Sequence, residues 1–181
     1  IRVAHLTDQH VGRVTPMSTQ REAVERINEE QPDLVALTGD YVAHSLSYLD
    51  QLEEVLSAVD APMIAVMGNH DHWSGPDEVR AVLRRVGAEI LDNAWTTVTV
   101  HGQPIQVAGV DDSYTGHADV ERATRGIDPS APALGLTHVP EEADDFWRHG
   151  VELVLAGHTH AGQLTLRDDP HRWNIAAFAG H

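Results

Sequence analysis

The sequence predicts an α/β protein in which short buried strands alternate with amphipathic helices. Apolar runs, most of them rich in β-branched or aliphatic residues and closed by polar or glycine residues, recur along the chain. Several of the segments between them carry apolar residues at the three-to-four spacing of a helix with one buried face. This alternation favours a layered sheet covered by helices. We expect strands at residues 3–7, 34–38, 63–67, 105–110, 133–137 and 151–156.

The helices are expected between these strands, and prolines mark several of their ends. Pro32 follows the first helical segment, whereas Pro76 and Pro140 precede the third and fourth. Proline suits a first helical turn and cannot continue a helix interior. We expect helices at residues 18–30, 49–59, 79–86 and 141–149.

The C-terminal part reads as two further strands, at residues 163–167 and 174–179, without a helix between them. We therefore expect part of the sheet to be antiparallel. No repeat or linker divides the chain, so a single domain over residues 1–181 is expected. The chain begins at Ile1 and not at Met, so we expect a mature or trimmed form, and the sequence assigns no compartment.

Composition excludes several classes of function. The sequence contains no cysteine, which removes disulfides, thiolate metal sites and cysteine nucleophiles. A formal net charge of -16 repels phosphate backbones, so no general nucleic-acid binding is expected. No apolar run approaches the roughly 20 residues that span a bilayer, so we expect no membrane span in this chain.

Polar side chains able to bind metal follow the predicted strands at their carboxyl ends. In open α/β sheets this edge is where ligands bind, because loops converge there. Asp-x-His and His-x-His place two side chains on one side of an extended segment, since a strand has a period of two. The expected metal ligands are Asp8, His10, Asp40, Asn69, His138, His158 and His160.

Such a set of nitrogen and oxygen donors suits Mn, Fe, Zn or Co more than calcium. Seven ligands exceed what one ion takes, and a carboxylate such as Asp40 can bridge two ions roughly 3.5 to 4 Å apart. A single Asp or His at a strand end is more often a capping or surface residue. The ordered set favours the metal site, because coincidence at successive strand ends is improbable.

The ordered blocks resemble the signature of the calcineurin-like metallophosphoesterases. They are Asp8-x-His10, Gly39-Asp40, Gly68-Asn69-His70-Asp71, His138 and Gly157-His158-Thr159-His160. The resemblance covers nearly the whole chain and implies a four-layer α/β/β/α sandwich of two mixed sheets flanked by helices. Residues 37–40, 109–112 and 157–163 look most like the small bacterial phosphodiesterase branch.

The resemblance implies a role for each matching residue. Asp40 would bridge two divalent ions, with manganese favoured over Fe, Zn or Co. His70 would contact the phosphate or protonate the leaving oxygen, and Asp71 would hydrogen-bond His70 and fix its tautomer. One ion would be held by Asp8, His10 and His160, and the other by Asn69, His138 and His158.

The implied reaction is attack of a hydroxide that bridges the two ions on a phosphoester, with a diester favoured over a monoester. The substrate would be a small molecule or a lipid or nucleotide diester. A phosphomonoesterase or nuclease of the same superfamily shares every ligand, and a catalytically silent metal-binding scaffold is the alternative from another class. The chain stops soon after His160, so strands supplied by a second subunit, and hence a homo-oligomer, are also considered.

Four neighbouring residues have weaker functional interpretations. Trp73 and His72 follow the Asn-His-Asp block and face either substrate or the core, with neither favoured. His44 lies one helical turn beyond Asp40, where it could support the site or merely pack. His5 is expected to be a core or edge histidine and not a ligand.

Overall fold

The structure is a computed structural model that describes residues 1–160. The two strands expected at residues 163–167 and 174–179 lie outside the described residues. Four parallel strands form the first sheet, paired in sequence order. They are β1 (Val3–Leu6), β2 (Leu34–Thr38), β3 (Met63–Val66) and β4 (Glu89–Ile90).

The second sheet is mixed. Its first two strands form an antiparallel hairpin, and the following two pairs are parallel. The antiparallel part of the described structure therefore lies at this hairpin. The four strands are β5 (Ala94–Val100), β6 (Gln103–Gly109), β7 (Ala133–Thr137) and β8 (Leu153–Ala156).

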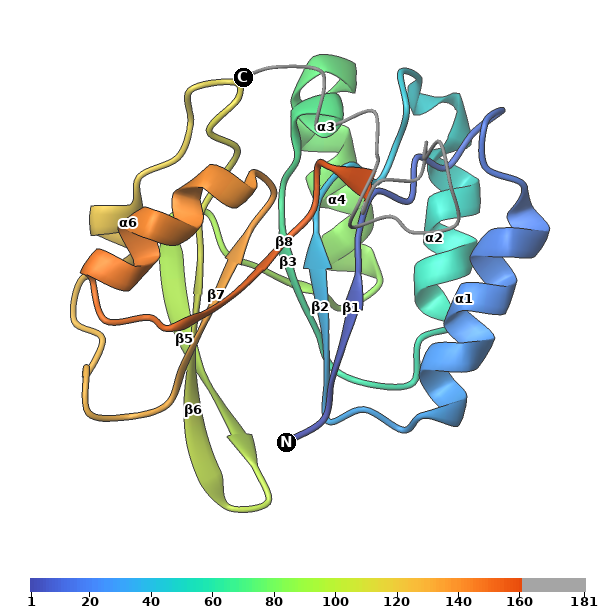
Figure 1. The fold of residues 1–181 in the computed structure, drawn as a ribbon. Helices are drawn as coiled ribbons and strands as arrows, with labels where there is room; N and C mark the ends of the chain where they lie inside the picture. The colour runs from blue at the N-terminus through green and yellow to red at the C-terminus, as the bar shows by residue number, and fades with distance from the viewer. Residues whose placement is uncertain (161–181) are drawn as a thin grey trace, which may run out of the picture.

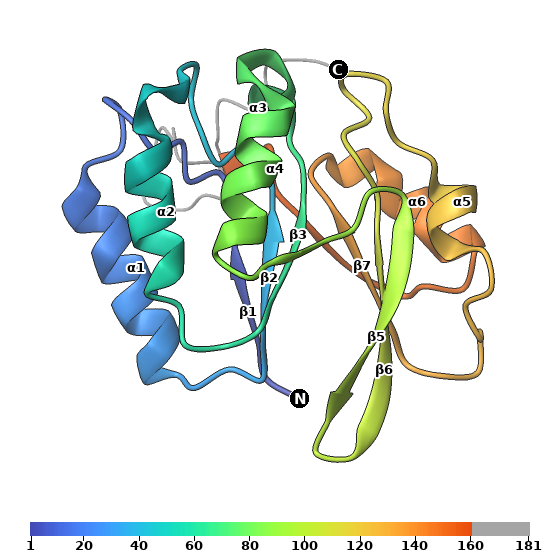
Figure 2. The same cartoon turned by 180° about the vertical axis from the view of Figure 1, so that it is seen from behind.

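Helices cover the outer faces of the two sheets. The first sheet is covered by α1 (Met17–Glu29), α2 (Leu49–Ser57) and α4 (Pro76–Arg85), and the second by α5 (Val120–Thr124) and α6 (Ala143–Arg148) (Figure 1). The view from behind shows the same separation of the two helical layers (Figure 2). Shorter segments complete the order: η1 (Leu46–Tyr48), α3 (Asn69–Ser74) and η2 (Pro140–Glu142).

Buried side chains of the central strand β2 alternate between two apolar cores. Val35 and Leu37 pack with the helices of the first layer, whereas Leu34 and Ala36 pack toward the second sheet. The period of two explains this division, because successive strand residues point to opposite faces. A third core lies between the second sheet and its helices, around Phe146. Three cores separate four layers, which confirms the predicted α/β class and the implied sandwich.

Two strands and two short helices were absent from the sequence-based prediction. Strand β5 has the sequence AWTTVTV and is largely half-buried or exposed, so it lacks the continuous apolar run that marks the other strands. Strand β4 has only two residues, and α3 and α5 are too short for helical periodicity to appear. Within residues 1–160, no helix combines the length and apolarity needed to cross a bilayer.

Candidate metal centre

The carboxyl ends of β1, β2, β3, β7 and β8 meet at one edge of the sandwich (Figure 1). Backbone hydrogen bonds continue the strand pairing into the loops that follow. The Asp8 N–H donates to Gly39 O at 3.1 Å, and the Gly157 N–H donates to His138 O at 3.0 Å. The sheet architecture therefore gathers polar loops that are far apart in the sequence.

Five of the expected ligands have left-handed backbone conformations. L-residues rarely adopt positive φ, and such strain persists only where the surrounding structure enforces it. Strain of this kind concentrates at functional sites. The residues and their φ values are Asp8 (51°), His10 (42°), Asp40 (56°), His158 (68°) and His160 (52°).

Glycine at position 157 allows the β8 loop to approach the end of β1. A Cβ atom at this position would overlap the Thr7 hydroxyl and would lie 2.7 Å from Asp8 Oδ2. The same Cβ would lie 3.2 Å from His138 Nδ1. Only glycine therefore lets the backbone pass between these side chains.

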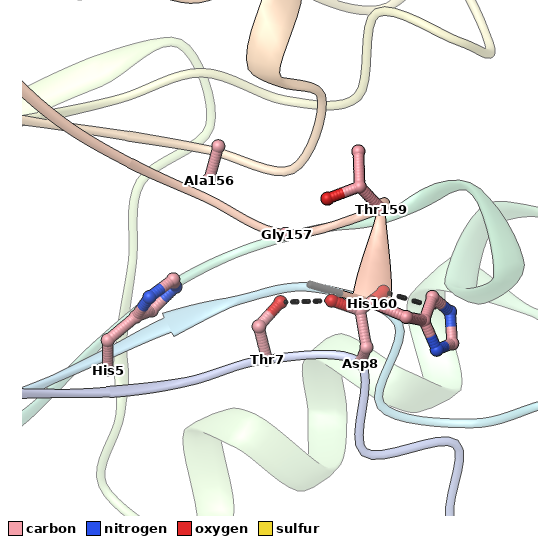
Figure 3. Close-up of a pocket in the computed structure, with 7 residues that line it drawn as sticks. All are labelled: His5, Thr7, Asp8, Ala156, Gly157, Thr159 and His160. Atoms are coloured by element: carbon pink, nitrogen blue, oxygen red, sulfur yellow. Dashed lines mark hydrogen bonds and ion pairs between the residues drawn. The ribbon is translucent and has the colours of Figure 1, made fainter. Parts of the chain in front are cut away.

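A first cluster contains Asp8, His10 and His160. The Nε2 atoms of the two histidines lie 3.2 Å apart, and His160 Nε2 lies 3.4 Å from Asp8 Oδ1. Figure 3 shows Asp8 and His160 facing each other, with the Thr7 hydroxyl donating to Asp8 Oδ2 at 2.8 Å. One potential ligand atom from each of Asp8, His10 and His160 lies within 4.8 Å of the other two, as binding of one metal ion requires.

A second cluster surrounds the fully buried His138. Its Nε2 atom lies 3.1 Å from Asn69 Oδ1 and 3.3 Å from His158 Nδ1. The other ring nitrogen, Nδ1, donates to Thr38 O at 2.7 Å. Once the imidazole is neutral, as a metal ligand must be, this hydrogen bond keeps the proton on Nδ1 and directs the Nε2 lone pair at the cluster.

Asp40 lies between the two clusters. Its Oδ2 atom is 3.5 Å from His10 Nε2 and 3.3 Å from His138 Nε2. The side chain is almost fully buried, and its Oδ1 atom accepts a hydrogen bond from the His70 N–H at 2.9 Å. The carboxylate is therefore held in a position from which it faces both sets of donors.

The imidazole of His70 borders the site and is partly exposed. Its Nδ1 atom contacts the carbonyl oxygen of Ala43, and its Nε2 atom lies 4.0 Å from Asp40 Oδ2. His44 packs against the same ring, with centroids 4.5 Å apart. The Ala43 carbonyl orients His70. No sequence pattern predicts this role, because every residue carries a backbone carbonyl oxygen.

The expected hydrogen bond from Asp71 to His70 is wrong. Successive residues of α3 point in directions about 100° apart around the helix axis, so the two side chains diverge. Asp71 is fully buried and supports the loop after β2. Its carboxylate accepts from the backbone N–H groups of Asp40, Tyr41, Val42 and Gly68 at 2.8 to 3.3 Å.

Burial and charge act in opposite directions on the titrating groups. Burial lowers the pKa of His10 and that of His158, which favours neutral imidazoles. Burial also opposes charge on His138, but the hydrogen bond and charge of Asp40 outweigh it and raise the pKa of His138 to about 9. Burial, and secondarily the negative charge of Asp40, raises the pKa of Asp71 to about 7, although the backbone N–H donors to its carboxylate act in the opposite direction.

These residues fit divalent metal ions. In each cluster, two imidazole nitrogens face each other at hydrogen-bond distance beside a buried carboxylate or an amide oxygen. Neutral imidazole lone pairs that converge on one point repel each other unless a proton or a cation lies between them. Imidazole and carboxylate are ligands of Zn, Fe and Mn, so the donor chemistry matches the expected ions.

Two cavities adjoin the clusters. One, of about 370 Å³, is lined by His5, Thr7, Asp8, Ala156, Gly157, Thr159 and His160 (Figure 3). The other, of about 570 Å³, reaches from His10 and His70 towards the start of α1. His5 itself pairs with the Thr38 hydroxyl at 2.7 Å, consistent with a histidine at the edge of the sheet and not a ligand.

Two aromatic residues, Trp73 and Tyr114, lie beside the candidate site, and the sequence suggested a role only for the first. Trp73 contacts the His70 ring, with centroids 5.1 Å apart, so its substrate-facing alternative is consistent with its position. Tyr114, in the loop after β6, contacts the His158 ring, with centroids 5.5 Å apart, and no sequence pattern singled it out. His72 instead pairs with Asp111, with its Nε2 atom 2.7 Å from Asp111 Oδ1.

Comparison with known proteins assigns the family. The family model for calcineurin-like phosphoesterases matches residues 1–162. The chain belongs to this family. Calcineurin-like phosphoesterases are metal-dependent, in agreement with the histidine and aspartate clusters.

Several members of this family are similar in sequence. Phosphodiesterase YaeI of Escherichia coli is 31% identical over 169 residues, which cover 90% of this chain and 62% of that protein. An uncharacterized metallophosphoesterase of Aquifex aeolicus is 32% identical over 174 residues, covering 91% of this chain and 64% of that one. The chain thus spans slightly less than two thirds of these relatives.

Solved structures share the fold. The protein TT1561 of Thermus thermophilus matches with a TM-score of 0.61 at 17% identity, over 86% of this chain and 81% of that one. A structure described as a novel archaeal phosphodiesterase matches with a TM-score of 0.52 at 20% identity, over 87% and 84%. Both support the two-sheet architecture of the calcineurin-like phosphoesterases.

Proposed function

We propose that this calcineurin-like phosphoesterase is a phosphodiesterase that works with two divalent metal ions, manganese being the first choice. The position of Asp40 carries the proposal, because one carboxylate oxygen faces His10 of the first cluster and His138 of the second. A carboxylate between two sets of nitrogen and oxygen donors suits a two-metal hydrolytic site. The first ion would be held by Asp8, His10 and His160, and the second by Asn69, His138 and His158.

Bound there, the ions would lower the pKa of water and polarise the phosphoryl oxygens. The His70 ring lies beside His10, with centroids 4.7 Å apart, and beside Asp40, and its Nδ1 atom contacts Ala43 O. A protonated His70 donates from Nδ1 to that carbonyl and presents its Nε2–H to the oxygen that leaves phosphorus. As the bond from phosphorus to the leaving oxygen breaks, this proton neutralises the alkoxide.

Two observations support a diester over a monoester. Phosphodiesterase YaeI is among the similar sequences, and the cavities beside the clusters provide room for two ester groups. The substrate we propose is a small-molecule, lipid or nucleotide diester. A phosphomonoesterase with the same ligands is the second candidate, and the assay below separates the two.

The test uses protein stripped with a chelator and then titrated with Mn, Zn, Fe or Co ions. Hydrolysis of bis(p-nitrophenyl) phosphate and of p-nitrophenyl phosphate is measured after each addition. We expect diesterase activity to return with two equivalents of metal and to exceed monoesterase activity. Preference for the monoester would favour the second candidate, and inactivity with every metal in folded, metal-binding protein would indicate a scaffold.

His70→Gln separates the proposed proton donor from metal binding. We expect this variant to bind two ions and to lose about 100- to 10,000-fold in turnover, the range of general acid catalysis. His149→Gln, which changes an exposed histidine at the end of α6, is the matched control and should keep full activity. Full activity of His70→Gln would contradict the assigned role.

A further inference from the structure

Two exposed aromatic rings stand side by side at the rim of the metal centre. Trp73, on α3, is 56% exposed, and Tyr114, in the loop after β6, is 63% exposed. Their ring centroids lie 5.8 Å apart and their planes meet at 76°. One ring follows a strand of the first sheet and the other follows a strand of the second, so the pair spans the boundary between the sheets.

The pair, hereafter the aromatic corner, also contacts both parts of the candidate site. The Trp73 ring lies 5.1 Å from the ring of His70, the proposed proton donor. The Tyr114 ring lies 5.5 Å from the ring of His158, a proposed ligand. A group bound against the corner would therefore be close enough to be attached to a phosphate at the metal centre.

Exposed apolar side chains that occur singly need no explanation, but an exposed group of them can mark a binding surface. Trp147 on α6 provides the comparison, since it is 57% exposed. Its indole N–H donates to Glu152 O within the same local segment. The corner differs because its two rings come from separate sheets and meet beside titratable side chains.

We infer that Trp73 and Tyr114 are specificity-determining residues that bind a flat aromatic ester group of the substrate. This inference rests on the proposed function, because the ring is taken to be attached to the scissile phosphate. Two perpendicular rings form a corner in which a third flat ring can stack on one face and present its edge to the other. A flexible alkyl chain gains neither contact.

The acidic character of the protein supports an uncharged recognition element. A net charge of -16 repels an anionic diester at long range, so the protein's overall charge cannot attract the substrate. Stacking does not depend on charge, and every nucleobase or aryl ring offers a π-face. The shared chemistry is thus a planar ring, supplied by a nucleobase or by a simple aryl ester.

The experiment measures equilibrium binding to the manganese-loaded full chain by isothermal titration calorimetry. Two ligand pairs differ mainly in ring planarity: phenylphosphonate against cyclohexylphosphonate, and uridine 5′-monophosphate against its 5,6-dihydro form. We expect the planar member of at least one pair to bind about five-fold more tightly or better, the lower range of base stacking. The pair that responds distinguishes an aryl from a nucleobase source.

Variants locate the preference. Trp73→Leu and Tyr114→Leu should reduce it to less than about two-fold, whereas Trp147→Leu, with matched exposure, should retain it. Trp73→Phe keeps a ring and should preserve most of the preference, so it serves if the leucine variant fails to fold. Equal binding of planar and non-planar ligands, or a preference that survives both leucine substitutions, would overturn the inference.

Hydrolysis of bis(p-nitrophenyl) phosphate is measured in parallel on the same preparations. Binding with a planar preference but without hydrolysis would reject the phosphodiesterase proposal and leave the aromatic corner standing. Hydrolysis without a planar preference would reject the corner alone. Absence of both hydrolysis and any phosphonate or nucleotide binding would reject both proposals.

Discussion

The Nε2 atoms of His10 and His160 lie 3.2 Å apart, although 150 positions separate the two residues in the chain. His10 follows β1 of the first sheet, and His160 follows β8 of the second. Both atoms face Asp8, which also accepts the His158 N–H at 3.1 Å. An ion held by this cluster would join the two sheets, so we expect metal binding and stability to be coupled.

His10→Ala should remove one of two bound ions. The variant loses a donor of the first cluster and leaves Asn69, His138 and His158 unchanged. We expect metal analysis to give one ion per chain and diesterase activity to fall at least about 100-fold. Loss of a residue that only hydrogen-bonds a metal ligand already costs about 10- to 100-fold in metal affinity or activity. His149→Ala is the control, and an unchanged stoichiometry in His10→Ala would exclude His10 as a ligand.

Asp71→Asn should destabilise the protein. An asparagine offers one acceptor oxygen, so N–H groups that now face Asp71 would meet an amide NH₂. Unsatisfied or opposed buried donors cost about 1 to 3 kcal/mol, and we expect a loss of that size in urea unfolding with chelator present. Asp144→Asn, on the exposed side of α6, should change the unfolding free energy little, and equal effects of the two substitutions would contradict this role.

Metal binding should release about one proton per chain at pH 7.5. The pKa of His138 is raised to about 9 in the metal-free protein, so this imidazole is protonated there and must become neutral to ligate. Burial lowers the pKa of His10 and that of His158, so they contribute little. Calorimetry of metal binding in HEPES and in Tris, which differ in ionisation enthalpy, measures the proton release. The release should disappear in His138→Gln. Metal binding to the wild type without proton release would contradict a protonated His138 in the metal-free protein.

The same group should make metal-free stability depend on pH. The folded-state pKa of His138 lies above the ordinary value of 6.5, so its protonated pairing with Asp40 stabilises the folded protein fully below pH 6.5. This contribution is lost as pH rises through about 9. With chelator present, the difference in unfolding free energy between wild type and His138→Gln should be larger at pH 6 than above pH 9, and a pH-independent difference would argue against the pairing.

Gly157→Ala should impair metal binding more than it impairs folding. The added methyl group would displace the Thr7 and Asp8 side chains and so distort the first cluster. Gly102→Ala, in the β5–β6 turn, is a matched control, because φ is +79° there and nothing lies within 4 Å of the new Cβ. We expect the control to lose roughly 1 to 2 kcal/mol of stability from left-handed strain while binding metal normally. Normal metal affinity in Gly157→Ala would show that the close approach is dispensable.

Local sequence patterns predicted much of the fold and the residues that form the candidate metal centre. The runs at 34–38 and 133–137 coincide with β2 and β7, because a strand buried on both faces needs consecutive apolar residues. The polar residues that end such runs share one edge of the sheet, so their gathering at one candidate metal centre could be expected without coordinates. The half-exposed β5 escaped prediction because its pattern depends on its partner β6.

Contacts between distant loops were not encoded in any local pattern. The backbone donors that hold Asp71 come mostly from the loop after β2, and the carbonyl that orients His70 belongs to Ala43, 27 positions away. Trp73 and Tyr114 meet only because the two sheets stack with their carboxyl edges on the same side. No sequence pattern identifies the partners of such backbone groups and ring contacts, because tertiary packing determines them. Candidate metal ligands, by contrast, can be recognised from the residue type of their side chains.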